Sequence, residues 1–125
     1  MGMQKRILLV DDDKDLRQTL SASLKAAGYK VASAANGMQA LRSSRAIHPD
    51  AIILDLLMPG MDGFAFCEHL RRHPETASIP VLVLSGLSSQ IARFAGLESG
   101  ANDYLTKPFY PSDLLERLKK LLTPA

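Results

Sequence analysis

Residues 6–13 read RILLVDDD, an apolar run that ends in three consecutive aspartates. A short run of Ile, Leu and Val is typical of a strand that is buried on both faces of a parallel sheet. Neighbouring carboxylates repel one another and raise each other's pKa unless a cation or solvent relieves them. The stretch therefore predicts a buried strand whose carboxyl end opens onto a charged site.

Four further strand-like runs occur along the chain, and a helical pattern follows each of the five runs. Strand-like runs are expected at residues 7–10, 29–34, 51–54, 80–84 and 103–105. Helical spacing of apolar residues is found at 16–27, 38–46, 64–72, 90–99 and 114–122. Five strand–helix units predict an α/β fold, a doubly wound five-stranded parallel sheet in the flavodoxin-like order 2-1-3-4-5 with helices on both faces.

The composition is that of an ordinary soluble domain. The chain has 125 residues, of which 46% are hydrophobic and 22% charged, and its length predicts one domain, residues 1–125, with a core from about 5 to 122. No apolar run reaches the ~18 residues of a membrane span, and no signal peptide begins the chain. The single cysteine, Cys67, fits a reducing compartment, so we expect a cytoplasmic protein without a membrane partner.

The charge distribution argues against direct nucleic-acid binding by this chain. The net charge is +2 and the cations are scattered, with no interleaved aromatic residues and no helix-turn-helix pattern.

Polar residues end four of the five expected strands. Ligands of an open parallel sheet bind outside the carboxyl ends of its strands, where the strand order reverses. The second strand ends in residues 34–37, AANG, without an ionisable group, and is expected at an edge. The other four end in side chains that would share one crevice: Asp11 and Asp12, Asp55, Ser85 and Lys107.

These residue types predict a magnesium site and phosphoryl transfer. Three carboxylates facing one lysine leave net negative charge, and Mg²⁺ is commonly held by a few carboxylates, waters and phosphate oxygens. An EF-hand calcium loop is excluded because Leu16 and Ala22 occupy its turn-glycine and final-ligand positions. A carboxylate beside the metal, with Lys107 and Ser85 in reach, could attack a phosphoryl group in line, and Asp55 is the best candidate nucleophile.

Four segments now match a known family: ILLVDDD (7–13), AIILDLLMPGMDGF (51–64), IPVLVLSG (79–86) and GANDYLTKPF (100–109). Over about residues 5–122 the sequence resembles the receiver domain of two-component response regulators, which are chemotaxis-regulator-like phosphoproteins. The resemblance implies that Asp55 accepts a phosphoryl group from a histidine kinase or a histidine phosphotransfer protein of a phosphorelay. It also implies that Lys107 and Ser85 bind the phosphoryl oxygens.

The resemblance further implies a metal set and a cis peptide bond. Asp12 and Asp55 would bind Mg²⁺ directly, Asp11 mainly through a water, and the backbone carbonyl of Leu57 would be a further ligand. The bond before Pro108 would be cis.

A switch is implied as well. Ser85 would move toward the phosphoryl group and Tyr104 would turn inward, which would change the surface of the fourth helix, fifth strand and fifth helix. That surface would control an output domain or downstream protein, and could also carry a phosphorylation-dependent homodimer. Its charged residues could equally be solvated surface: Arg93, Glu98, Asp103, Glu116 and Arg117.

Two apolar residues depart from the chemotaxis-type members. Leu57 and Leu87 stand where polar side chains help to position attacking water, so we expect slow autodephosphorylation.

Other interpretations fit less well. A haloacid-dehalogenase-like phosphatase needs Thr or Val where Asp15 stands, and a flavodoxin would need a hydroxyl-rich loop where 11–13 are acidic. A receiver-like domain that only binds partners is disfavoured, because every chemical role of the site is filled in this sequence.

Asp13 fits the N-cap of the first helix. His69 and His73 share a helix face, but with Cys67 expected in the core they lack a third metal ligand. Whether the chain is a stand-alone regulator or part of a longer protein is left open.

Overall fold

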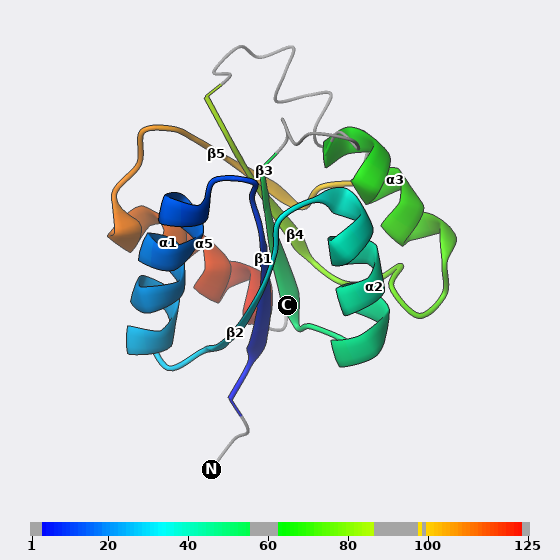
Figure 1. Cartoon of the computed structure of the whole chain (residues 1–125), viewed down its shortest axis with the longest axis horizontal. Coiled ribbons are helices and arrows are strands. Elements are labelled where there is room, and N and C mark those ends of the chain that lie inside the picture. The colour runs from blue at the N-terminus through cyan, green and yellow to red at the C-terminus, as the bar shows by residue number, and fades with distance from the viewer. Residues whose placement is uncertain (1–3, 56–62, 87–97, 99, 124–125) are drawn as a thin grey trace.

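The computed structural model describes residues 4–55, 63–86, 98 and 100–123, and its strands form one parallel sheet (Figure 1). The strand order is β2-β1-β3-β4-β5, as the sequence predicted. The strands are β1 (Arg6–Val10), β2 (Lys30–Ala34), β3 (Ala51–Asp55), β4 (Val81–Ser85) and β5 (Asp103–Thr106).

Helices cover both faces of the sheet. Figure 1 shows α1 (Lys14–Ala26) and α5 (Pro111–Leu122) on one side, with α2 (Gly37–Ile47) and α3 (Gly63–Arg72) on the other. The helix predicted at 90–99 lies outside the described residues apart from Glu98. Among the described helices none is long and apolar enough to cross a membrane.

The strands read as continuous apolar runs because each face packs on helices. In β1, Ile7 and Leu9 pack with the residues of α1 and α5, whereas Leu8 and Val10 pack with those of α2 and α3. All four side chains are at most 1% exposed. This double burial is the reason that no polar alternation appears in the sequence of the strand.

The ends of α1 follow the sequence signals. Asp13 is the N-cap, and its Oδ1 accepts hydrogen bonds from the amides of Asp15 (2.9 Å) and Leu16 (3.2 Å). Gly28 follows the C-cap Ala27 with a φ of 99°, a conformation that glycine adopts without strain. The N-cap fixes where the chain leaves the sheet edge, directly after the acidic residues, and the C-cap fixes where it turns back toward β2.

The α5 helix begins three residues before the apolar stripe that predicted it. Pro111 is suited to a first helical turn because it needs no backbone donor there. Asp113 then accepts a 3.3 Å hydrogen bond from the amide of Tyr110. The first turn of α5 thus contains the polar capping residues, and the buried apolar face of the helix begins at Leu114.

At the amino end of the parallel strands, the side chain of Arg71 connects α3 by hydrogen bonds to the segments that precede β4 and β5. Its guanidinium donates to the carbonyl oxygens of Ala77 (3.0 Å), Ile79 (2.8 Å) and Gly100 (2.7 and 3.0 Å), and to Asn102 Oδ1 (2.9 Å). Gly100 has a φ of 115°, and a Cβ built there would lie 2.8 Å from Cγ of Arg71. The glycine therefore allows the close approach that this set of hydrogen bonds requires.

Candidate functional site

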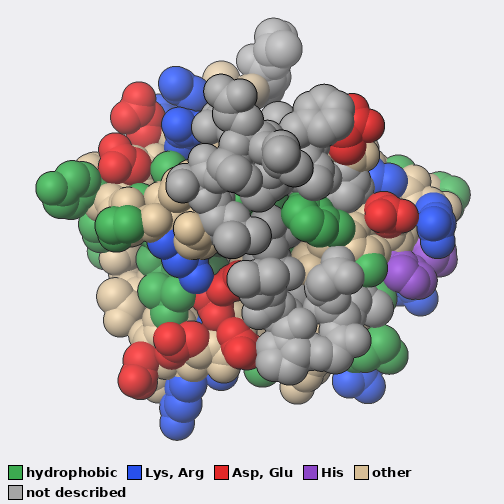
Figure 2. Space-filling model, turned by 90° about the horizontal axis from the view of Figure 1, so that it is seen from above, with side chains coloured by type: hydrophobic (Ala, Val, Ile, Leu, Met, Phe, Trp, Pro, Cys, Tyr) green, Lys and Arg blue, Asp and Glu red, His purple; other side chains and the backbone are tan. Residues whose placement is uncertain are grey.

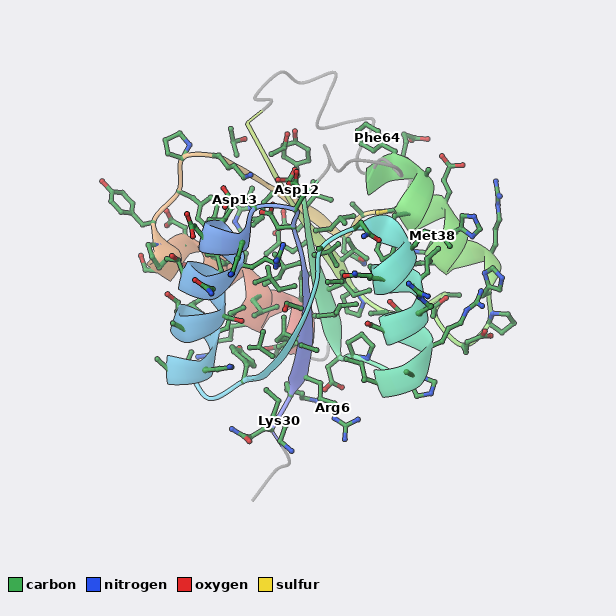
Figure 3. All side chains as sticks on the ribbon, viewed as in Figure 1. Arg6, Asp12, Asp13, Lys30, Met38 and Phe64 are labelled. Atoms are coloured by element: carbon green, nitrogen blue, oxygen red, sulfur yellow. The ribbon has the colours of Figure 1, made fainter. Side chains whose placement is uncertain are left out.

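The acidic residues of the first and third strands meet at the carboxyl edge of the sheet. Figure 3 places Asp12 at the end of β1 opposite to Arg6, and Figure 2 shows acidic side chains gathered near the middle of this edge. The strand order reverses here, because β2 lies on one side of β1 and β3 on the other. One oxygen each of Asp11, Asp12 and Asp55 lies within 4.8 Å of the others. The structure thus brings together the three carboxylates that the sequence singled out.

Asp11 is the buried member of the cluster, with only 2% of its surface exposed. Its Oδ1 accepts a 3.0 Å hydrogen bond from the amide of Asp13, whereas its Oδ2 is buried without a hydrogen-bond partner among the described residues. Burial raises the pKa of Asp11 from its ordinary value to about 6. The negative charge of Asp55 raises this pKa further, whereas the hydrogen bond from the Asp13 amide and the positive charge of Lys107 lower it. A buried carboxylate oxygen without a donor is suited to a cation.

Asp55 and Lys107 form the polar pair at the mouth of the site. Nζ of Lys107 donates to Oδ2 of Asp55 over 2.9 Å, with the side chains 30% and 12% exposed. Asp55 is the last residue of β3, and Lys107 follows β5, so the pair spans β4, which lies between these strands. The partial exposure leaves the carboxylate of Asp55 reachable from solvent.

Ser85 ends β4 and lies next to this pair in the sheet. Ser85 is 1% exposed and lies opposite Thr106 in the pairing of β4 with β5. Its backbone carbonyl accepts a 2.7 Å hydrogen bond from the amide of Lys107. A hydroxyl is therefore held at the strand end where the resemblance expects a phosphoryl ligand. The roles of Ser85 and Lys107 stay predictions.

Tyr104 lies inside the core. It is 1% exposed and belongs to the core cluster that contains Phe66, Leu70 and Val83. Its role as a switch stays a prediction.

Of the remaining features predicted for the site, the structure describes the peptide bond before Pro108 but not the residues Leu57, Leu87 and Arg93. The Lys107–Pro108 peptide bond is cis, as the resemblance implied. Leu57, Leu87 and Arg93 lie outside the described residues.

The donor set suits a magnesium ion. Three carboxylates from two strand ends converge, one of their oxygens is buried without a donor, and a single lysine contacts the set in the described structure. Hard oxygen ligands with space for water and phosphate oxygens are what Mg²⁺ prefers.

One contact of the site was missed from the sequence. Arg17, in the first turn of α1, donates from Nη1 to the backbone carbonyl of Asp11 over 2.6 Å. Sequence spacing could only have suggested a cation near the acidic residues, because the direction of a long side chain depends on its packing.

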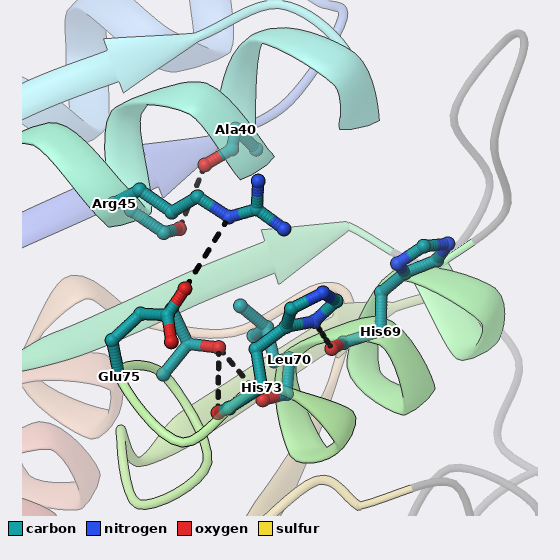
Figure 4. Close-up of polar contacts among 8 residues, drawn as sticks. Ala40, Arg45, His69, Leu70, His73 and Glu75 are labelled. Carbon is teal, nitrogen blue, oxygen red and sulfur yellow. Dashed lines mark hydrogen bonds and ion pairs between the residues drawn. The ribbon is translucent and has the colours of Figure 1, made fainter.

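His69 of α3 and His73, which directly follows that helix, do not form a second site. Both histidines are half-buried, and their rings stack with centroids 6.0 Å apart (Figure 4). Nδ1 of His73 lies 3.0 Å from the carbonyl oxygen of His69. Cys67 is buried as predicted, and Asp11, Asp12 and Asp55 make the one possible three-ligand metal group found among the described residues.

Comparisons with known proteins agree with this geometry. The sequence matches the response regulator receiver domain family over residues 7–119. It is 44% identical over 117 residues to the DNA-binding dual master transcriptional regulator RpaA of Synechocystis, covering 94% of this chain and 48% of RpaA. The chain thus spans about half the length of the curated relatives it matches.

Solved structures show the same fold. The chemotaxis response regulator CheY4 of Vibrio cholerae is 37% identical with a TM-score of 0.91, covering 96% of this chain and 100% of CheY4. The receiver domain of the sensor histidine kinase PA1611 from Pseudomonas aeruginosa is 32% identical with a TM-score of 0.88, covering 96% of this chain and 98% of that domain. That structure has a magnesium ion coordinated in its active site cleft. Family match, relatives and fold agree, and the chain belongs to the receiver domain family of two-component response regulators.

Proposed function

We propose that this chain is a single receiver domain in which Asp55 accepts a phosphoryl group from a phosphohistidine of a histidine kinase or phosphotransfer protein. The observation that carries the proposal is the Asp55–Lys107 pair, 2.9 Å apart, set over a carboxylate cluster that contains the buried Oδ2 of Asp11. A structural salt bridge alone would not need two further carboxylates at the same point.

The reaction follows from the groups at the mouth of the site. A carboxylate oxygen of Asp55 attacks phosphorus in line, a new O–P bond forms, and the N–P bond of the phosphohistidine breaks with its electron pair leaving on the imidazole nitrogen. The ammonium of Lys107, which pairs with Asp55 Oδ2, moves to a phosphoryl oxygen. The hydroxyl of Ser85 donates to another, so the chain supplies positive and donor groups where negative charge gathers.

Magnesium is the proposed cofactor. Asp12 and Asp55, Asp11 through a water and the backbone carbonyl of Leu57 would hold it, and once bound it neutralises charge on the phosphoryl oxygens. The magnesium ion in the cleft of the PA1611 receiver domain supports this assignment.

The proposed output is a change of the surface formed by β5, α5 and the helix expected at 90–99. Phosphorylation adds about −1.5 to −2 charges beside Ser85, at the carboxyl end of β4 next to β5. Asp103 and Arg117 on this surface form a 2.8 Å ion pair that could exchange into a phosphorylation-dependent homodimer. Partners would be an output domain or a downstream protein in the cytoplasm, and RpaA, a DNA-binding regulator, makes transcription one candidate output.

The proposed chemistry is tested by intact mass after incubation with the small phosphodonor phosphoramidate. The wild type should gain one phosphoryl group in Mg²⁺ and none in EDTA, and Asp55→Ala should gain none under either condition. A wild type that stays unmodified, or an adduct that persists in Asp55→Ala, would contradict the proposal.

A further inference from the structure

Arg17 makes a contact that the phosphoryl-transfer chemistry does not use. The residue lies in the first turn of α1, half-buried, and its Nη1 is 2.6 Å from the backbone carbonyl oxygen of Asp11. Such a short distance is typical of a charge-assisted hydrogen bond, which is roughly twice as strong as a neutral one. The guanidinium therefore holds the backbone at the residue where β1 ends and the acidic turn begins.

The other hydrogen bonds of the acidic turn, residues 11–13, involve the amides of Asp11 and Asp13 and the side chain and carbonyl of Asp13. The amide of Asp11 donates to the carbonyl of Ala34 over 3.1 Å, and the amide of Asp13 donates to Oδ1 of Asp11 over 3.0 Å. Asp13 in turn caps α1. Of these bonds, only that from Arg17 fixes the carbonyl of Asp11, and thereby the peptide plane between Asp11 and Asp12.

We propose that Arg17 is a positioning residue for the magnesium site, an inference that rests on the proposed function. Its hydrogen bond orients the peptide plane from which Asp11 and Asp12 both project, so the two carboxylates are already arranged when the metal arrives. Side chains that orient metal ligands typically contribute 10- to 100-fold in metal affinity.

The charge of Arg17 acts in the opposite direction. A guanidinium beside a cation site repels the cation, so removing it would tighten Mg²⁺ binding if charge were its only contribution. Removing the hydrogen bond would weaken binding if orientation dominates. The sign of the change in affinity therefore separates the two roles.

The experiment is a Mg²⁺ titration followed by amide chemical shifts, on the wild type and four variants. Arg17→Met keeps the aliphatic stem without the donors, Arg17→Gln is shorter but stays polar, and Arg17→Lys keeps a charged donor. Lys14→Ala is the matched control, since Lys14 is an exposed cation in the same turn of α1 and lines the same groove as Arg17. We expect the dissociation constant to rise about tenfold in the Met and Gln variants, to stay within about threefold in the Lys variant, and to stay level or fall in Lys14→Ala.

A second readout guards against simple loss of structure. Mg²⁺ raises the stability of any folded protein that binds it, so a tenfold weaker site shrinks the gain at saturating Mg²⁺ by about 1.4 kcal/mol relative to the same variant in EDTA. Met and Gln variants that bind Mg²⁺ as tightly as the wild type, or more tightly, would overturn the proposal. So would a Lys variant as weak as these two. A wild type that does not bind Mg²⁺ would instead overturn the proposed function.

Discussion

The buried carboxylate of Asp11 should make the metal-free protein less stable as the pH rises. Its ordinary pKa is 3.8, and burial raises that value to about 6 in the folded state. A raised pKa means that the folded state binds the proton more tightly than the unfolded state. The stabilisation is therefore complete below pH 3.8 and is lost as the pH rises through about 6.

The magnitude follows from these two values. A shift of about two units corresponds to about 3 kcal/mol between the extremes, since each unit is worth 1.36 kcal/mol. Between about pH 4.5 and about pH 7.5 the expected loss is about 2 kcal/mol. Asp11→Asn removes the titrating group but keeps an oxygen that can accept from the Asp13 amide, so its stability should lack this contribution.

The assay is urea unfolding of the wild type and Asp11→Asn in EDTA at both pH values. The difference between the two proteins cancels the titration of the three histidines, which both contain. We expect Asp11→Asn to gain about 2 kcal/mol on the wild type between the lower and the higher pH. Saturating Mg²⁺ should remove most of that advantage, because the cation stabilises the ionised carboxylate of the wild type. A difference that does not change with pH would refute the reasoning.

Three further predictions concern Leu57, Gly100 and Lys107. Leu57→Asn should shorten the lifetime of the phosphorylated form several-fold, because an amide can position water that a leucine excludes; equal decay rates of the two phosphoproteins would count against this. Gly100→Ala should lower the free energy of unfolding by about 1 to 3 kcal/mol in urea titrations, since its φ of 115° and the side chain of Arg71 leave no room for a Cβ. An unchanged midpoint would show that the turn adapts. Lys107→Met should tighten Mg²⁺ binding by up to about tenfold, because the ammonium competes with the cation for Asp55; a weaker or unchanged dissociation constant would contradict that competition.

The sheet and the cluster could be predicted because both depend on simple periodic features. Uninterrupted Ile, Leu and Val runs mark strands buried on both faces, and parallel strands place their carboxyl ends at one edge. The residues that end β1 and β3 therefore had to meet, whatever the details of packing. Asp13 was likewise predictable as a cap, because its role depends on residues only two and three positions away.

The parts that sequence reasoning missed depend on side-chain direction. The bond from Arg17 to the Asp11 carbonyl depends on how α1 lies against β1. The five donor contacts of Arg71 involve carbonyls and an amide up to 31 residues away, beyond the reach of any helical pattern.

The central claim is that Asp55 carries the phosphoryl group. The most direct measurement is reductive trapping: the protein is phosphorylated in Mg²⁺, treated with borohydride to convert an acyl phosphate into homoserine, digested, and sequenced by mass spectrometry. The account predicts homoserine at position 55 alone, with Asp11 and Asp12 unmodified and no conversion in EDTA. Conversion at another carboxylate, or a stable phosphoryl group that borohydride does not remove, would contradict it.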